Sequence, residues 1–202
     1  MKKLVVILMA VAFVVTMGTA ALAGGNPLKT AEKAFHKSLT SLVPKDKLRT
    51  TAQMYDEWQK LMAGKSKAIL LDTRTHPEFA AFHIEGSSHI HAGHMYTIPK
   101  KIKDPNADIW VYCRTQHRAG YVAGMLYKYG YKNVKYVVKD GKVKGGVVGW
   151  AQLGYPFVNY FTGQFKITQY MKQGSWSERN CGNYIREFTG QRGETCGKKT
   201  LK

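Results

Sequence analysis

Short apolar runs and helical patterns alternate through the middle of this 202-residue chain. The apolar runs are four to six residues long and lie between polar turns, which is typical of strands that a sheet buries on both faces. We expect strands at 68–71, 88–91, 108–112 and 133–138, and helices at 51–62, 77–82, 119–129 and 147–153. Alternating strands and helices with short connections predict an α/β domain with a mainly parallel central sheet flanked by helices.

Cys113 stands at the carboxyl end of the strand expected at 108–112 and shortly before the helix expected at 119–129. Sites on parallel sheets gather beyond the carboxyl ends of the strands, where Asp72 also lies. Residues 114–118, with the sequence RTQHR, add three basic side chains, backbone N–H groups and a helix start, all of which favour a thiolate over a thiol. Cys113 is therefore the candidate nucleophile, and we expect its pKa to be lowered. The alternative is an inert thiol buried at a strand end.

The first 23 residues have the layout of a secretory signal peptide. Two lysines precede an apolar run at 4–17, and Ala21-Leu22-Ala23 follows as a small-residue cleavage motif. We expect cleavage near Ala23, which would place residues 24–202 in the periplasm or outside the cell. The alternative is an uncleaved membrane anchor, because residues 4–23 could nearly span a bilayer.

The chain is strongly basic, with a formal charge of +18 that becomes +16 when Lys2 and Lys3 leave with the signal peptide. Such a charge attracts anions over a Debye length of about 10 Å. The basic residues are spread along the chain instead of gathering on one helix, so we expect most of them to be solvated. For an exported protein, this predicts small anions and an acidic envelope surface as partners, and no nucleic acid.

Three cysteines suggest one disulfide and one free thiol in an oxidising compartment. Cys181 and Cys196 are the expected pair, since both lie in the polar C-terminal segment with 14 residues between them. A bridge that closes such a loop adds about 3 kcal/mol of stability. Cys113 is then the free thiol. The alternatives are that all three cysteines stay reduced or that the C-terminal pair binds a metal.

The predicted organisation is one domain with two extensions. After the signal peptide, an N-terminal helical extension covers 24–47, with a helical pattern at 28–42 that Pro44 ends. The α/β domain covers 48–158. Residues 159–202 form a basic, aromatic C-terminal extension; a separate module that binds a partner is the alternative for this segment.

Several motifs of the α/β domain resemble, in their order and spacing, those of the rhodanese (thiosulfate sulfurtransferase) family. They are Leu71-Asp72-Thr73-Arg74 with Glu78-Phe79, His83-Ile84-Glu85-Gly86-Ser87 with His89-Ile90, the loop that starts at Cys113, Gly145-Gly146 with Trp150, and Gly154-Tyr155-Pro156. The resemblance covers a little over half of the chain. It implies a three-layer rhodanese-like fold and a sulfurtransferase that uses no cofactor.

The mechanism that the resemblance implies is covalent catalysis. The Cys113 thiolate takes the outer sulfur of a small anionic donor such as thiosulfate and holds it as a persulfide, until a thiophilic small molecule or protein accepts it. Substrate binding and persulfide stabilisation fall to the loop residues Arg114, Thr115, Gln116, His117 and Arg118. Asp72 and Arg74 are expected to support this loop.

Loop length separates this chemistry from that of related phosphatases, which place five residues between Cys and Arg. Here four residues separate Cys113 from Arg118, and the next residue, Ala119, cannot hold a phosphate oxygen. The shorter loop resembles the sulfurtransferase branch. Two alternatives stay open: phosphatase or arsenate-reductase chemistry on the same cysteine, and a non-catalytic binding module that recruits an envelope partner.

The sequence departs from the family pattern at two positions. Gln116 stands where many such loops have glycine, so a loop that needs a positive φ there would be strained. Phe82 stands where glycine usually precedes the His-Ile pair, which affects the local turn. Four nearby histidines, His83, His89, His91 and His94, suggest a metal site, but we expect structural roles and no metal because no acid or cysteine completes a ligand set.

Overall fold

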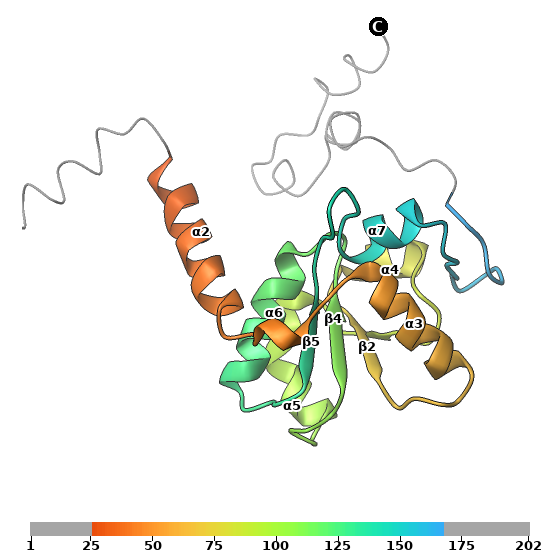
Figure 1. Ribbon diagram of the computed structural model, residues 1–202, viewed down its shortest axis with the longest axis horizontal. Helices are drawn as coiled ribbons and strands as arrows, with labels where there is room; N and C mark the ends of the chain where they lie inside the picture. The colour runs from red at the N-terminus through yellow and green to blue at the C-terminus, as the bar shows by residue number, and fades with distance from the viewer. Residues whose placement is uncertain (1–25, 168–202) are drawn as a thin grey trace, which may run out of the picture.

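The computed structural model describes residues 26–167 (Figure 1). The expected signal peptide and the expected Cys181–Cys196 bridge therefore lie outside the described residues. Cys113 lies within them as a free, buried thiol.

In the described part of the chain, five parallel strands form one sheet in the order β1-β5-β4-β2-β3. The strands are β1 (Leu48–Arg49), β2 (Ile69–Asp72), β3 (Ser88–His89), β4 (Ile109–Tyr112) and β5 (Val134–Val137). The sheet confirms the expected α/β fold. Because β2 and β4 are neighbours with Asp72 opposite Tyr112, the segments that follow them meet at one edge of the sheet.

Helices cover both faces of the sheet (Figure 1). The longer ones are α2 (Pro27–Thr40), α3 (Thr51–Met62), α4 (His76–Ala81), α6 (His117–Lys128) and α7 (Gly146–Gln152), and the shorter ones are η1 (Lys45–Lys47), η2 (Ala92–Thr97) and α5 (Ile98–Lys101). Alternate strand residues point to opposite faces: Leu71 and Val111 pack with α5 and α6, whereas Leu70 and Trp110 pack with α3 and α7. The result is the three-layer arrangement that the resemblance implied.

Capping residues in the sequence explain where α3 and α4 begin. Thr50 and Gln53 form a capping box at the start of α3, and Thr75 and Glu78 form one at the start of α4. Each box satisfies backbone N–H groups that a helix start leaves open. Sequence analysis did not predict β1, η1, η2 or α5, which are too short to show a hydrophobic period.

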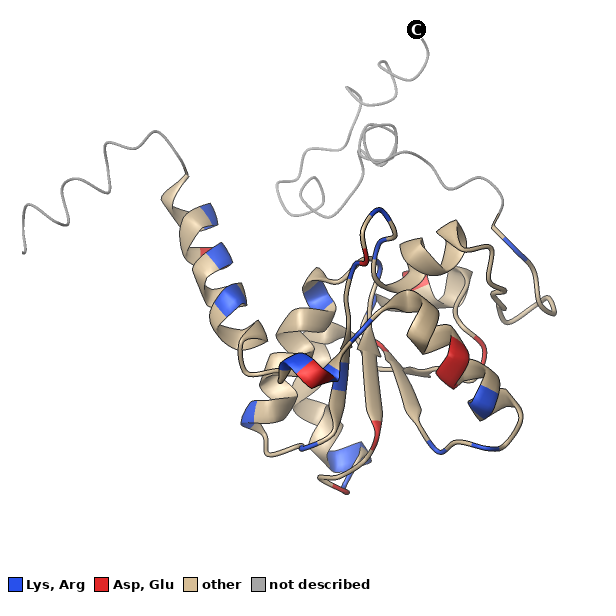
Figure 2. Ribbon diagram, in the orientation of Figure 1, with Lys and Arg blue, Asp and Glu red and all other residues tan. Residues whose placement is uncertain are grey.

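The basic residues are spread over the helices and loops of residues 26–167, and acidic residues are fewer (Figure 2). Within this range, no helix is both long enough and apolar enough to cross a membrane.

Candidate active site

The Cys113 loop connects β4 to α6, and the start of α7 packs against it. The Val147 N–H donates to the Cys113 carbonyl at 3.0 Å, and the Val148 N–H donates to the Arg114 carbonyl at 3.0 Å. Gly146, with a φ of +64°, makes this contact fit, since a Cβ there would lie 2.1 Å from the Cys113 carbonyl oxygen. The glycine pair of the sequence motif is therefore what allows α7 to hold the loop.

Cys113 itself is almost fully enclosed, with 1% of its surface exposed. Burial raises the pKa of the Cys113 thiol, and the backbone N–H groups of Ala119 and Thr115 and the charge of Arg118 act in the opposite direction. The net direction is upward, so the expected lowering of the Cys113 pKa is wrong for the resting protein. Sequence analysis counted the positive groups near the thiol but not the cost of removing a thiolate from water.

Gln116 fits the loop without strain. Its φ is −164°, an extended value, and every positive φ in the described residues belongs to a glycine. The Gln116 side-chain oxygen accepts a hydrogen bond from the Lys139 N–H at 2.9 Å, and its backbone carbonyl accepts one from the Tyr136 hydroxyl at 3.1 Å. Gln116 therefore ties the loop to β5 through its backbone and to the segment after β5 through its side chain, and a glycine could form only the first of these bonds.

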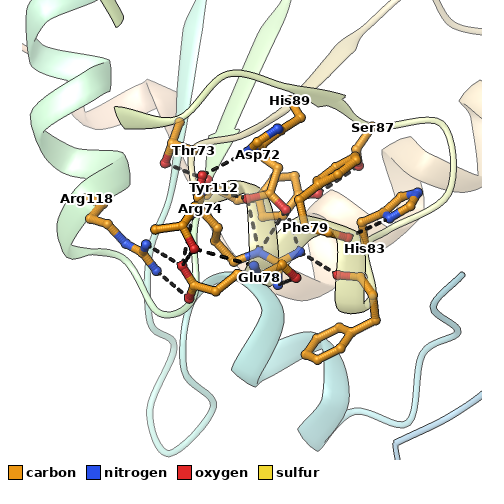
Figure 3. Close-up of polar contacts among 12 residues, drawn as sticks. Asp72, Thr73, Arg74, Glu78, Phe79, His83, Ser87, His89, Tyr112 and Arg118 are labelled. Atoms are coloured by element: carbon orange, nitrogen blue, oxygen red, sulfur yellow. Dashed lines mark hydrogen bonds and ion pairs between the residues drawn. The ribbon is translucent and has the colours of Figure 1, made fainter. Parts of the chain in front are cut away.

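Asp72, the last residue of β2, forms a buried ion pair with Arg74 (Figure 3). Arg74 Nη2 lies 2.7 Å from Asp72 Oδ2, and the two residues are 1% and 0% exposed. Arg74 Nε also donates to Asp72 Oδ2 at 2.8 Å, while Nη1 donates to the Glu78 carbonyl at 2.9 Å and Nη2 to the Phe82 carbonyl at 2.7 Å. The pair thus holds a carbonyl within α4 and the carbonyl of Phe82, which follows its C-terminal end. Extended Phe82, with a φ of −170°, needs no glycine there.

Arg118 lies at the first turn of α6 and forms an ion pair with Glu78 of α4 (Figure 3). Its two terminal nitrogens donate to the two Glu78 carboxylate oxygens at 2.6 and 2.8 Å. Partial burial acts to raise the pKa of Glu78, but hydrogen bonds from Arg118 and Thr75 outweigh it and hold that pKa at about 2. Sequence analysis named Glu78 only as part of a motif and missed that it neutralises Arg118.

The remaining loop residues lie nearer the surface. Arg114 and Thr115 are partly buried, whereas the His117 side chain is 55% exposed. His117 Nε2 donates to Glu32 of α2 at 2.8 Å. Sequence analysis gave Glu32 no role, and only its position on a helical pattern that precedes the domain could have drawn attention to it.

Histidines line the same edge of the sheet. His83 donates to the Phe79 carbonyl at 2.9 Å and His89 to the Arg74 carbonyl at 2.8 Å. His76, His91 and His94 form a looser group, with ring centroids 5.6–6.2 Å apart. Among residues 26–167, no three His, Cys, Asp or Glu side chains are arranged to hold a metal ion.

The family to which this domain belongs follows from a match to a family model. The model of the rhodanese-like domain matches residues 55–153, which include β2, Cys113, α6 and the glycine pair before α7. Residues 55–153 are a rhodanese-like domain. Curated proteins offer no match to the chain.

Solved structures of the same fold are distant from this rhodanese-like chain. A rhodanese-like domain from Anabaena sp. is 16% identical, with a TM-score of 0.47, over 63% of this chain and 95% of that chain. Thiosulfate sulfurtransferase from Pseudomonas aeruginosa is 20% identical, with a TM-score of 0.47, over 68% of this chain and 25% of that chain. The polysulfide-sulfur transferase homodimer from Wolinella succinogenes is 20% identical, with a TM-score of 0.48, over 66% of this chain and 90% of that chain.

Proposed function

We propose that this protein is an exported sulfurtransferase that carries sulfur on Cys113. The observation that carries the proposal is the placement of the Cys113 thiol at the carboxyl end of β4, where the Ala119 and Thr115 N–H groups and the Arg118 charge favour an anion on its sulfur. Cysteine catalysis needs this arrangement, because the thiolate is the nucleophile. The family match supports the same reading at the level of the domain.

In the first step, the Cys113 thiolate attacks the outer sulfur of an anionic donor such as thiosulfate. A new S–S bond forms to Cys113, the S–S bond of the donor breaks, and its electron pair leaves with sulfite. In the second step, a thiophilic acceptor such as cyanide attacks the outer persulfide sulfur and leaves as thiocyanate, and the electron pair of the broken bond returns to Cys113 as thiolate. No net oxidant or reductant is needed.

Burial of Cys113 would protect the persulfide that forms in the first step. A persulfide anion held by backbone N–H groups inside a closed loop is shielded from other thiols and oxidants, while the same burial disfavours the resting thiolate. An approaching anionic donor has to compete with Glu78 for Arg118, or bind to Arg114 and the loop N–H groups. Donor binding and the Glu78–Arg118 ion pair are therefore coupled.

The loop also favours sulfur over phosphate as the transferred group. Four residues lie between Cys113 and Arg118, and the N–H groups that contact the Cys113 sulfur are those of Thr115 and Ala119. A phosphatase or arsenate-reductase reaction on Cys113 would require a wider ring of donors around a tetrahedral oxyanion.

One observation favours a second function, a rhodanese-fold module that binds an envelope partner without catalysis. In the resting protein the Cys113 pKa is raised and Arg118 is already neutralised by Glu78. Under this alternative Cys113 is a core residue, and the basic surface recruits an acidic partner (Figure 2).

Intact mass after treatment with thiosulfate tests the sulfurtransferase. The mature protein is expected to gain the mass of one sulfur atom, to lose it on addition of cyanide with release of thiocyanate, and to gain nothing as the Cys113→Ser variant. The sulfurtransferase function would be rejected if the wild-type protein took up no sulfur and if Cys113→Ser left the rate of thiocyanate production unchanged. Turnover of a phosphate ester that depends on Cys113 would instead favour the phosphatase.

A further inference from the structure

Helix α2 packs against α6, which lies between α2 and the sheet (Figure 1). Two glycines four residues apart on α6 allow a close approach. A Cβ on Gly124 would lie 2.5 Å from the backbone oxygen of Leu39, and a Cβ on Gly120 would lie 2.7 Å from Nε2 of His36. Residues four apart share one face of a helix, so this face of α6 is shaped to receive α2.

The contact between α2 and α6 centres on His117, the first residue of α6. His117 Nε2 donates to Glu32 at 2.8 Å, and the His36 Nε2 donates to the His117 carbonyl at 3.2 Å. The His36 and His117 rings stack with centroids 4.2 Å apart and planes 13° apart. One turn along α6, the Tyr121 hydroxyl donates to the same Glu32 oxygen at 2.6 Å. Both the side chain and the backbone of His117 are thus held by α2.

His117 belongs to the turn that faces the Cys113 sulfur on its other side. Two residues further, the Ala119 N–H forms the backbone hydrogen bond that most lowers the Cys113 pKa against burial. The orientation of that N–H depends on the first turn of α6. On the side of the sheet, β5 and α7 hold the loop through hydrogen bonds to Gln116, Cys113 and Arg114. On the opposite side of α6, α2 holds His117.

We infer that α2 is part of the sulfur-transfer site, with Glu32 and His36 as positioning residues that act through His117 on the loop around Cys113. The chemical part of this inference rests on the proposed function. Because α2 precedes the family match at 55–153, the inference gives the N-terminal extension a role that the rhodanese-like domain alone does not imply.

The experiment measures two properties of Cys113 in the mature protein and in the variants Glu32→Ala and His36→Ala. The first is the rate of alkylation by iodoacetamide against pH, followed at the Cys113 peptide by mass spectrometry, which requires no sulfur transfer. The second is the rate of sulfur loading from thiosulfate. Lys33→Ala is the matched control, because Lys33 lies on the exposed side of α2.

Both test variants are expected to raise the pH midpoint of Cys113 alkylation and to slow sulfur loading several-fold, whereas Lys33→Ala matches the wild type. Loss of the Glu32 charge alone would lower the midpoint, because a nearby carboxylate disfavours a thiolate. In Glu32→Ala, the direction of the shift therefore separates positioning from simple electrostatics, and His36→Ala tests the hydrogen bond to the His117 carbonyl. Midpoints and rates equal to the wild type, or a lower midpoint, would overturn the inference.

Gly124→Ala tests the docking of α2 without removing any side chain that forms a hydrogen bond between α2 and α6. Alanine favours a helix over glycine by about 1 kcal/mol, so α6 itself is not weakened, but the new Cβ would clash with the Leu39 carbonyl and force α2 away from α6. We expect faster hydrogen exchange in α2 and the same rise in the alkylation midpoint. Gly163→Ala is the control, since its Cβ would meet nothing within 4 Å.

If hydrogen exchange in α2 becomes faster while the reactivity of Cys113 stays unchanged, α2 only packs against the domain and the inference is wrong. If the wild type alkylates normally but never loads sulfur, the proposed function fails instead.

Discussion

Arg118 and Glu78 join α6 to α4 across the edge of the sheet that holds Cys113, with nitrogen–oxygen distances of 2.6 and 2.8 Å. The arginine that sequence analysis assigned to the donor therefore has a carboxylate partner in the resting protein. The pair links Glu78 to Cys113 through Arg118, because the Arg118 charge that acts to lower the Cys113 pKa is also paired with the Glu78 carboxylate.

Replacing Glu78 by glutamine tests this influence. Glu78→Gln keeps a side chain that can complete the capping box of α4 but leaves the Arg118 charge unneutralised. We expect Cys113 to alkylate several-fold faster at neutral pH and the KM for thiosulfate to fall, at a cost of about 1–3 kcal/mol in the free energy of unfolding.

Glu57→Gln is the matched control for that variant. Glu57 pairs with Lys60 at 3.2 Å on α3, so its loss removes a comparable ion pair without touching α6. The control should leave alkylation of Cys113 unchanged. Equal alkylation rates in Glu78→Gln and the wild type would show that the ion pair has no bearing on the thiol.

Gly146 is expected to be the least replaceable glycine of the site. In Gly146→Ala the side chain would meet the Cys113 carbonyl at 2.1 Å, and the residue would also keep a φ of +64°. Gly154→Ala is the control, because it has a similar φ of +71° but nothing within 4 Å of its Cβ. Both variants bear the backbone strain of about 1–3 kcal/mol.

Only the Gly146→Ala variant should move the loop. We expect it to lower the rate of sulfur loading at least tenfold beyond any loss in Gly154→Ala, with unfolding midpoints measured alongside. Similar rates in the two variants would mean that the contact between α7 and the loop is not needed for reactivity.

Gln116 gives a prediction about the loop itself. Gln116→Ala removes the hydrogen bond from the Lys139 N–H at 2.9 Å, and Gln152→Ala removes a bond of the same kind and length from the Lys144 N–H. Each loss should cost about 0.5–1.5 kcal/mol of stability. Only Gln116→Ala should slow sulfur loading on Cys113, and a matching loss in Gln152→Ala would assign the effect to stability alone.

The sequence allowed the fold and the position of Cys113 at the end of β4 to be predicted because these depend on local patterns. The buried runs around β2 and β4 and the motif glycines are visible along the chain, and the rhodanese resemblance orders them. The role of Asp72 and Arg74 as supports of the loop stays a prediction, because their hydrogen bonds join them to each other and to the carbonyls of Glu78 and Phe82.

The electrostatics of the site could not be predicted in the same way. The pairing of Glu78 with Arg118 joins residues 40 positions apart, and that of Glu32 with His117 joins residues 85 apart. Such pairs depend on how α4 and α2 pack against α6, which no periodicity reveals. The direction of the Cys113 pKa depends on how completely the loop encloses the sulfur, and that too is a property of the packing.

The low pKa of Glu78 predicts how stability depends on pH. Glu78 titrates near 4.5 when unperturbed and at about 2 in the folded protein. As the pH falls below about 4.5, the unfolded chain takes up a proton on Glu78 before the folded protein does, so the unfolded state binds more protons and stability decreases. The stabilisation is complete above this window and is lost as the pH approaches 2. Urea unfolding at a series of pH values should therefore show that the stability difference between the wild type and Glu78→Gln shrinks through this window. A difference that stays constant with pH would show that the Glu78 carboxylate is not held by Arg118 and Thr75 in solution.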